Sequence, residues 1–444
     1  MILPQSGDLI VSSLGLCRFP SPLQPRGQLL VDPTNRVLVS AETADLELYL
    51  DAGQRPPSFG LAGPRAQLFF DPTTITCGIV TCGGLCPGVN DVIRSVVHTL
   101  TFGYGVPRVL GFRYGYAGLA ANSGYPPIAL TLEAVSNIHT IGGTTLGSSR
   151  GPQDVSEMVD TLQRHQVSIL FTIGGDGTLR GAAALSREIA QRKLPISIIG
   201  IPKTIDNDLG WTDRSFGFAT AVEEATTAID AAHTEAHGAW NGIGLVKLMG
   251  RHSGFIAAHA SLANSDVNFC LIPEVRFALE GKDGFLDLLM QRLERRHHAV
   301  IVVAEGAGQE LLQDPAKQER DASGNLRLKD IGIFLRDEVT RFLQARHLDF
   351  SIKYIDPSYI IRSLPANAVD SEFCLILGQH AVHAGMAGYT DMVIGYWNRH
   401  FTQVPISLAV ARRKQLDPEG PEWQSVLQAT GQPASMMGTY EPHP

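Results

Sequence analysis

The 444-residue chain lacks the features that mark secreted, membrane-spanning and nucleic-acid-binding proteins. Its six cysteines form no paired Cys-x-x-Cys sites with zinc spacing, and they favour a reduced, cytoplasmic setting. No apolar run is long enough to span a membrane, and the N-terminus lacks the charged-then-apolar pattern of a signal peptide. Long basic runs are also missing and the formal net charge is −8, so we expect no nucleic acid and no membrane among its partners.

The composition that remains is that of a folded, globular protein. Hydrophobic residues make up 44% of the chain and charged residues 18%, which allows a large buried core. The length favours two lobes over a single domain. Residues 1–72 differ from the rest, because prolines recur there and periodic apolar patterns are weak. We expect an extension with little regular structure, which fits a simple tail as well as a role in assembly.

From Ile75 onward, short apolar runs alternate with helical patterns. This alternation favours parallel sheets covered by helices on both faces, and ligands bind such sheets at the carboxyl ends of the strands. The predicted strands cover 75–80, 167–173, 196–201, 243–249, 268–272 and 299–304, and the predicted helices cover 89–100, 331–343 and stretches that begin near 179 and 254.

A glycine-rich turn, Gly174–Thr178, follows one predicted strand with the sequence Gly-Gly-Asp-Gly-Thr. Glycines let the backbone approach a phosphate chain, and the helix that follows offers its positive end to the anion. A lone carboxylate in such a turn, here Asp176, suits a Mg²⁺ ligand. An ordinary strand-to-helix turn with a capping aspartate would give the same pattern.

A second cluster of polar residues follows the strand predicted at 196–201. Lys203 comes first, and Thr204–Asp208 then reads Thr-Ile-Asp-Asn-Asp. Two carboxylates beside a hydroxyl and an amide suit phosphoryl transfer, because one acid can take a proton from an attacking alcohol while the other orients the metal or the base. The ammonium of Lys203 can neutralise a transferring phosphoryl group. An aspartate-rich loop that caps a helix remains the alternative.

Cationic side chains follow further strands and turns, which favours an anionic small-molecule substrate. Arg150 lies in a glycine-rich loop and suits a phosphate clamp, while Arg251 comes just after a predicted strand. Glu305 holds a similar place and can accept hydrogen bonds from sugar hydroxyls. Simple surface side chains remain the alternative for most of these residues, including Lys353 and Tyr359. The histidines lack the spacing and supporting acids of a zinc site.

Taken together, these segments resemble the phosphofructokinase family from about Ile75 to the region of Gly395. Each motif is weak alone, but all of them in the family's order form a specific signature. The motifs are Thr81-Cys82-Gly83-Gly84, Gly147-Ser148-Ser149-Arg150, Gly174–Thr178, Pro202–Asp208, Met249-Gly250-Arg251 and Asp356-Pro357-Ser358-Tyr359-Ile360-Ile361-Arg362.

The resemblance implies a role for each motif in transfer of a phosphoryl group to the 1-hydroxyl of fructose 6-phosphate. It makes Asp206 the proton acceptor and Asp176 the Mg²⁺ ligand, with Lys203, Asp208 and Arg251 as further catalytic residues. Donor-site residues are Gly84, Tyr116, Arg150, Gly151, Gly175, Asp176, Gly177 and Thr178. Sugar-phosphate residues are Thr204, Ile205, Asp206, Met249, Gly250, Arg251, Glu305, Lys353, Tyr359, Ile360, Ile361 and Arg362.

The same resemblance implies an α/β fold of two Rossmann-like three-layer lobes with mainly parallel sheets and the active site in the cleft between them. An extension would cover 1–73, the ATP lobe 74–216 and about 365–395, and the fructose 6-phosphate lobe 217–364 and about 396–444. The family further implies an allosteric, glycolytic enzyme that forms a homotetramer. Its usual arginine before the Met-Gly-Arg strand is absent at Asn241–Gly244, which leaves the contribution of a neighbouring subunit open.

The phosphoryl donor depends on two residues that point in opposite directions. Family members that use diphosphate carry an aspartate where this chain has Gly177, and glycine leaves room for the α-phosphate of ATP. Lys203 is typical of diphosphate users, but the plant-like ATP-dependent branch pairs it with this glycine. We therefore expect ATP, with a diphosphate-dependent enzyme and a catalytically silent regulatory subunit as alternatives. NAD kinases and lipid kinases share only the glycine turn.

Overall fold

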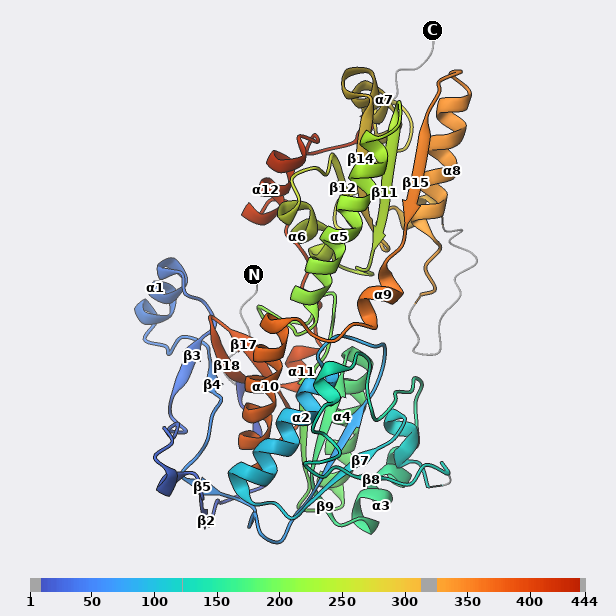
Figure 1. Ribbon diagram of the computed structural model, residues 1–444. Helices are drawn as coiled ribbons and strands as arrows, with labels where there is room; N and C mark the ends of the chain where they lie inside the picture. The colour runs from blue at the N-terminus through green and yellow to red at the C-terminus, as the bar shows by residue number, and fades with distance from the viewer. Residues whose placement is uncertain (1–8, 122, 313–325, 440–444) are drawn as a thin grey trace. The chain divides into compact units, whose positions relative to one another are not determined.

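The chain forms two compact units in the computed structural model, which describes residues 9–121, 123–312 and 326–439 (Figure 1). The larger unit contains 1–205, 209–217 and 363–413. The smaller unit contains 206–208, 218–362 and 414–444, so the chain passes between the units several times. None of the described helices combines the length and apolar character that a membrane crossing requires.

The larger unit is built on a sheet that has nine strands in the described residues, in the order β3-β4-β18-β17-β10-β9-β6-β7-β8. The run from β17 to β7 is parallel, and the strands on either side of it are antiparallel to their neighbours. The strands are β3 (Arg36–Leu38), β4 (Ser58–Leu61), β6 (Thr76–Thr81), β7 (Arg108–Phe112), β8 (Ile128–Ala129), β9 (Val167–Gly174), β10 (Ser197–Pro202), β17 (Met392–Trp397) and β18 (His400–Pro405).

Helices cover both faces of this sheet. Successive strand residues point in opposite directions, so the apolar strands present buried side chains to the helices on each face. Leu170 and Ile198 belong to a buried cluster with apolar residues of α3 and α4, whereas Ile169 and Ile199 lie under Gly385 of α10. Helix α2 packs beside α10 on that second face. The helices are α1 (Thr43–Asp51), α2 (Val89–His98), α3 (Val155–Arg164), α4 (Asp176–Gln191), α10 (Ala368–Met386) and the short α11 (Ile406–Ala409).

The smaller unit repeats this plan around a parallel sheet in the order β12-β14-β11-β15. Ile243 and Leu245 face the cluster formed with α7 and α8, while Gly244 between them faces Ala232 of α5. The strands are β11 (Gly242–Leu248), β12 (Phe269–Leu271), β14 (His298–Ala304) and β15 (Ser351–Ile355), beside a small pair of β13 (Lys282–Gly284) and β19 (Met437–Thr439). The helices are α5 (Phe218–His237), α6 (Phe255–Ala263), α7 (Phe285–Arg296), α8 (Ile331–Gln344), α9 (Ser358–Arg362) and α12 (Pro421–Thr430).

The N-terminal segment is more ordered than its sequence predicts. The expectation of little regular structure over 1–72 is wrong for the described part, because β3 and β4 extend the large sheet and α1 lies between them in the chain. Phe59 of β4 is fully buried and meets Trp211 and Trp397 edge-on or nearly so. Two further pairs, β1 (Ser12–Ser13) with β16 (Tyr389–Thr390) and β2 (Phe19–Pro20) with β5 (Gln67–Leu68), tie the segment to the rest of the unit.

The strands predicted from Ile75 onward are all present within one or two residues, and each is followed by the turn or helix that its sequence indicates. The α/β fold with a large, mainly parallel sheet is therefore confirmed. All six cysteines lie among the described residues, and none of them forms a disulfide bond.

Candidate functional site

Three loops of the larger unit meet at one edge of its sheet because their strands are neighbours in register. Pro202 at the end of β10 pairs with Gly174 at the end of β9, and Thr81 of β6 pairs with Ile173. The glycine turn, the Lys203 loop and the Gly83–Gly84 loop therefore begin side by side. Parallel sheets bind their ligands at this carboxyl edge.

The glycine turn places Asp176 in the first turn of α4, with Gly175 as the N-cap. Its carboxylate lies 3.2 Å from Arg413 and 3.7 Å from Arg180. A Cβ added at Gly174 would lie 2.2 Å from the hydroxyl oxygen of Thr178, so this position requires glycine. A Cβ at Gly177 would meet no atom within 4 Å, so open space lies beside the helix N-terminus.

Lys203 links its own loop to the other two. Its side chain is buried, with the residue 7% exposed, and the ammonium donates to the Gly84 carbonyl at 2.6 Å. Its backbone N–H donates to the Gly174 carbonyl at 3.0 Å. A Cβ at Gly84 would lie 3.6 Å from Nη2 of Arg150. The structure thus gathers Lys203, Gly84 and Arg150 around the turn, and Gly151 follows Arg150 with a φ of +97°.

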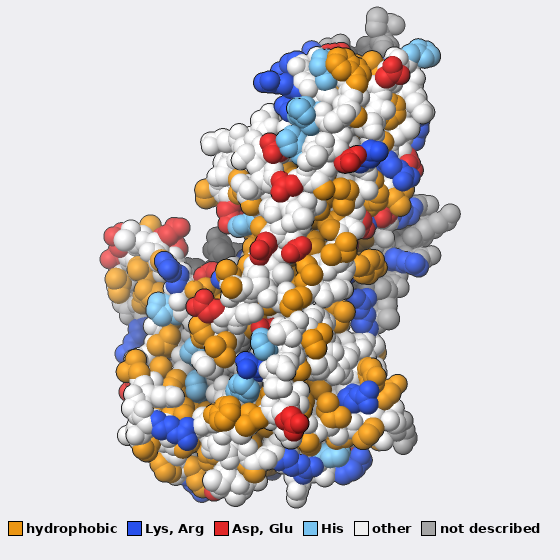
Figure 2. Space-filling model, in the orientation of Figure 1, with side chains coloured by type: hydrophobic (Ala, Val, Ile, Leu, Met, Phe, Trp, Pro, Cys, Tyr) orange, Lys and Arg blue, Asp and Glu red, His pale blue; other side chains and the backbone are white. Residues whose placement is uncertain are grey.

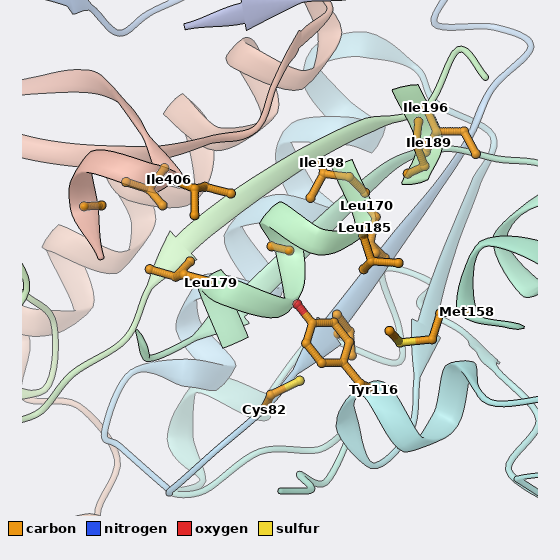
Figure 3. Close-up of a cluster of buried hydrophobic side chains, with 14 of the residues drawn as sticks. Cys82, Tyr116, Met158, Leu170, Leu179, Leu185, Ile189, Ile196, Ile198 and Ile406 are labelled. Carbon is orange, nitrogen blue, oxygen red and sulfur yellow. The ribbon is translucent and has the colours of Figure 1, made fainter. Parts of the chain in front are cut away.

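Tyr116 packs beside the glycine turn and contacts its backbone. Its ring belongs to the apolar cluster shown in Figure 3, near Cys82 and Met158, and is only 8% exposed. Burial raises the pKa of its phenol well above the usual value, and the hydroxyl donates to the Thr178 carbonyl at 2.7 Å. Tyr116 therefore holds the backbone of the turn, and its assignment to the donor site stays a prediction.

The polar cluster at Thr204–Asp208 continues the Lys203 loop. The Ser215 hydroxyl donates to the Thr204 carbonyl at 2.5 Å, and Ile205 is 8% exposed. Thr204 and Ile205 both belong to the larger unit. Asp206 and Asp208 are grouped with the smaller unit. Lys203 and Asp206 therefore lie on one short stretch of chain, although they belong to different units.

Asp206 is a buried carboxyl with unusual electrostatics. Burial, followed by the charges of Asp208 and Glu305, raises its pKa to about 7, against the lowering effect of Arg362 and of the Arg251 N–H. Its Oδ1 is buried and has no hydrogen-bond partner among the described residues. Ser253 fixes the backbone by donating to the Asp206 carbonyl at 3.2 Å. Such a carboxyl is poised to accept a proton near neutral pH.

Two loops of the smaller unit sit beside each other at the carboxyl edge of its sheet. Leu248 of β11 pairs with Ala304 of β14, so Arg251 and Glu305 follow neighbouring strand ends. The Glu305 N–H donates to the Leu248 carbonyl at 2.8 Å, and the Gly306 N–H donates to the Gly250 carbonyl at 3.0 Å. Gly250 has a φ of +123°, which a residue with a side chain rarely adopts.

The segment after β15 brings some of the predicted sugar-phosphate residues to these loops and leaves others away from them. Arg362 at the end of α9 donates to the sulfur of buried Met249 at 3.3 Å, and Ile361 is fully buried. Tyr359 and Ile360 are 79% and 65% exposed. Lys353 lies in the middle of β15, half exposed, and its nearest acidic group is that of Glu235 at 3.9 Å.

Sequence reasoning missed a charge network beneath this segment. Lys247 lies within the otherwise apolar strand β11, and its ammonium lies 2.7 Å from Asp330 and 2.8 Å from Asp356. Burial is the largest single influence on the pKa of Lys247 and lowers it. The hydrogen bonds to the two carboxylates together outweigh burial, so the pKa is raised overall. Asp330 also caps α8, and Asp356 starts the segment that carries Arg362. A lysine inside a buried strand was the signal, because such a charge needs a partner.

Among the described residues, no group of three or more histidine, cysteine, aspartate or glutamate side chains is arranged to hold a metal ion. A single carboxylate is nevertheless compatible with Mg²⁺, because this ion takes one or two protein carboxylates together with substrate phosphates and water. The carboxylate of Asp176 is 26% exposed and so fits this requirement.

A pocket of about 280 Å³ in the smaller unit contains none of the predicted site residues. It is lined by His233, Ser265, Asp266, Asn268, Arg292, Arg296, His298, Ala429 and Thr430. Figure 2 shows arginine, lysine and histidine side chains together at the upper end of the molecule, the end where α7 is drawn in Figure 1.

Comparison with known proteins identifies the family of the chain. The family model described as phosphofructokinase matches residues 76–385. The "ATP-dependent 6-phosphofructokinase" of Borreliella burgdorferi is 48% identical over 442 residues, which is 97% of this chain and 98% of the relative. The "ATP-dependent 6-phosphofructokinase 1" of Arabidopsis thaliana is 47% identical over 385 residues, covering 86% and 80%.

A solved structure supports the fold. The pyrophosphate-dependent phosphofructokinase of Marinobacter aquaeolei superposes with a TM-score of 0.66 at 22% identity, over 83% of this chain and 93% of that one. The predicted resemblance, including its plant-like branch, is confirmed by the relatives. This chain belongs to the phosphofructokinase family.

Proposed function

We propose that this chain is an ATP-dependent 6-phosphofructokinase, which transfers the γ-phosphoryl group of ATP to the 1-hydroxyl of fructose 6-phosphate in glycolysis. The observation that carries the proposal is Asp206, a buried carboxyl with a pKa of about 7 and an unpartnered oxygen, inside the Thr204–Asp208 motif. Relatives nearly half identical to the chain over almost its whole length bear this name.

The acceptor half of the reaction uses residues of the smaller unit. Asp206 takes the proton of the sugar 1-hydroxyl as the new bond to phosphorus forms. Asp208 and Glu305 keep the affinity of Asp206 for that proton high, because both negative charges raise its pKa. Arg251 and Arg362 supply positive charge for the 6-phosphate, and Glu305 can also accept hydrogen bonds from sugar hydroxyls. The exposed Tyr359 and Ile360 are available to the sugar phosphate as well.

The donor half uses the three loops of the larger unit. The helix N-terminus at Gly175–Thr178 and the guanidinium of Arg150 bind phosphates, and the open space at Gly177 accommodates the α-phosphate of ATP. Asp176 would hold Mg²⁺, which neutralises the donor phosphates when bound. Lys203 is fixed by the Gly84 carbonyl beside the turn, where its charge offsets that of the transferring group.

The decisive experiment is a coupled assay for fructose 1,6-bisphosphate with fructose 6-phosphate and Mg²⁺, run once with ATP and once with diphosphate. We expect product with ATP only. Product with diphosphate only would mean that Lys203 outweighs Gly177 in choosing the donor. Asp206→Ser should lower turnover by roughly 10²–10⁴-fold while leaving fructose 6-phosphate binding intact.

The catalytically silent alternative is separated by the same assay. A regulatory subunit would bind both ligands and form no product, and Asp206→Ser would then change nothing. We further propose a cytoplasmic homotetramer on the basis of the family, and analytical ultracentrifugation tests that assembly.

A further inference from the structure

Glu274 holds the N-terminus of α6, although the sequence motifs assigned no role to it. It follows β12, and its Oε1 accepts the Gly254 N–H at 3.0 Å and the Leu416 N–H at 2.9 Å. Its Oε2 is buried and has no hydrogen-bond partner among the described residues. Burial raises the pKa of this carboxyl, against the lowering effect of the N–H groups that it accepts. One side chain thus joins two segments that are far apart in the chain.

The loop that Glu274 anchors carries groups that contact the proposed base. This loop, residues 249–254, runs from the end of β11 to Gly254, which is the N-cap of α6. The hydroxyl of Ser253 donates to the Asp206 carbonyl at 3.2 Å. The N–H of Arg251 bonds to the Asp206 carboxyl and lowers its pKa. The place of Arg251 and Ser253 beside Asp206 therefore depends on where the loop ends.

The segment 414–416 bonds to the same groups from the other side of Glu274. Its first N–H donates to the Asp208 carbonyl at 2.8 Å. The amide of Gln415 donates to the His252 carbonyl at 3.2 Å, and the last N–H of the segment is the one that Glu274 accepts. The carboxylate of Glu274 is therefore the point at which this segment and the 249–254 loop are tied together.

We propose that Glu274 is a positioning residue for the acceptor half of the reaction, which holds Arg251 and Ser253 in place against Asp206. The inference rests on the proposed function. Loss of the carboxylate would leave the buried N–H groups of Gly254 and Leu416 without their acceptor, so both segments would have to move. A small displacement of a positioning group weakens substrate contacts strongly. The glycine turn of the donor site lies in the larger unit and has no bond to Glu274 among those described.

The test combines calorimetry with pH profiles of turnover in the full-length protein. Glu274→Ala should raise the Kd for fructose 6-phosphate by roughly 10- to 100-fold and leave the Kd for ATP unchanged. The acid limb of its profile should move to higher pH, because Asp206 loses the Arg251 N–H that favours its ionised form. Glu274→Gln keeps an oxygen that accepts both N–H groups and should restore most of the affinity.

The matched control is Asp287→Ala, which removes another carboxylate from the start of a helix in the same unit. Asp287 lies in the first turn of α7 and accepts the Asp283 N–H at 3.0 Å. Its loss should lower the melting temperature and leave both Kd values and the pH profile as in the wild type.

Other outcomes would overturn the inference. An unchanged Kd for fructose 6-phosphate with a lower melting temperature in Glu274→Ala would make Glu274 structural only, and equal rises in both Kd values would indicate general loosening. If Glu274→Ala does not fold, Glu274→Asp decides, because its shorter side chain should still raise the Kd for the sugar phosphate; wild-type values there would refute the role. If the wild type forms no product with ATP, the proposed function fails, and the ratio of variant to wild-type Kd for fructose 6-phosphate still decides the role of Glu274.

Discussion

The pH dependence of turnover provides a sharp test of the role of Asp206. A general base must be ionised to accept a proton, and the pKa of this carboxyl is raised from 3.8 to about 7, chiefly by burial. The rate should therefore fall about tenfold for each pH unit below 7 and level off above it. The second-largest cause of the raised pKa is the charge of Asp208, which a neutral amide would remove.

The variant Asp208→Asn should move the acid limb of the profile to lower pH by roughly one unit, since a nearby like charge shifts a carboxyl pKa by about that much or more. The assay records initial rates from pH 5.5 to 8.5 at subsaturating fructose 6-phosphate, with ATP saturating. Ionisation of the substrate phosphate affects wild type and variant equally, so the difference between the two profiles isolates the enzyme group.

The control is Asp337→Asn, which removes an exposed carboxylate of α8 that pairs with the neighbouring Arg336. Its profile should superimpose on that of the wild type. An acid limb that stays in place in Asp208→Asn, or that moves to higher pH, would refute the argument that Asp208 and burial set the basicity of Asp206.

Three further predictions concern stability and donor choice. The folded carboxyl of Asp206 holds its proton up to about pH 7, so the free energy of unfolding should fall as the pH rises from 3.8 through 7. The variant Asp206→Asn should therefore be up to about 4 kcal/mol more stable than the wild type at pH 8 and similarly stable at pH 4. Urea unfolding at the two pH values measures this difference. Gly177→Asp should fold normally, since its Cβ meets open space, but should lower kcat/KM for ATP by roughly tenfold through repulsion of the α-phosphate, in the coupled assay. Lys247→Met should cost about 3 kcal/mol by leaving Asp330 and Asp356 without their shared cation, and should raise the KM for fructose 6-phosphate more than that for ATP.

The parts of the fold that sequence could predict are those where local pattern and burial agree. The apolar run at 167–173 became β9 and the periodic stretch at 331–343 became α8, because each element buries its apolar side chains completely or along one face. The N-terminal strands could not be predicted in this way. Ser58–Leu61 is only four residues long, and it is a strand because β18 offers it a partner far along the chain.

The site shows the same division. The motif residues lie at strand ends, so parallel pairing brings them together, as it does for Pro202 and Gly174. Contacts made by residues distant in sequence were out of reach: Arg413 carries no motif, and its pairing with Asp176 appears only when 409–413 folds back onto α4. Tyr116 was assigned from the family resemblance alone, and its hydrogen bond to the Thr178 carbonyl is a contact between residues distant in sequence that only the fold reveals.

The pairing of β17 with β10 has a consequence for any shortened form of this protein. Met392 and Val393 of β17 pair with Ile199 and Gly200 and so occupy the edge of β10. Strands β18, β4 and β3 continue the sheet outward from β17. The family match stops at residue 385 and begins at residue 76, so a chain trimmed to it would lose this whole series of strands. The bare edge of β10 would then offer unpaired N–H and C=O groups to other molecules, a ready template for aggregation. The N-terminal extension and the strands after α10 thus protect the edge of β10 from self-association.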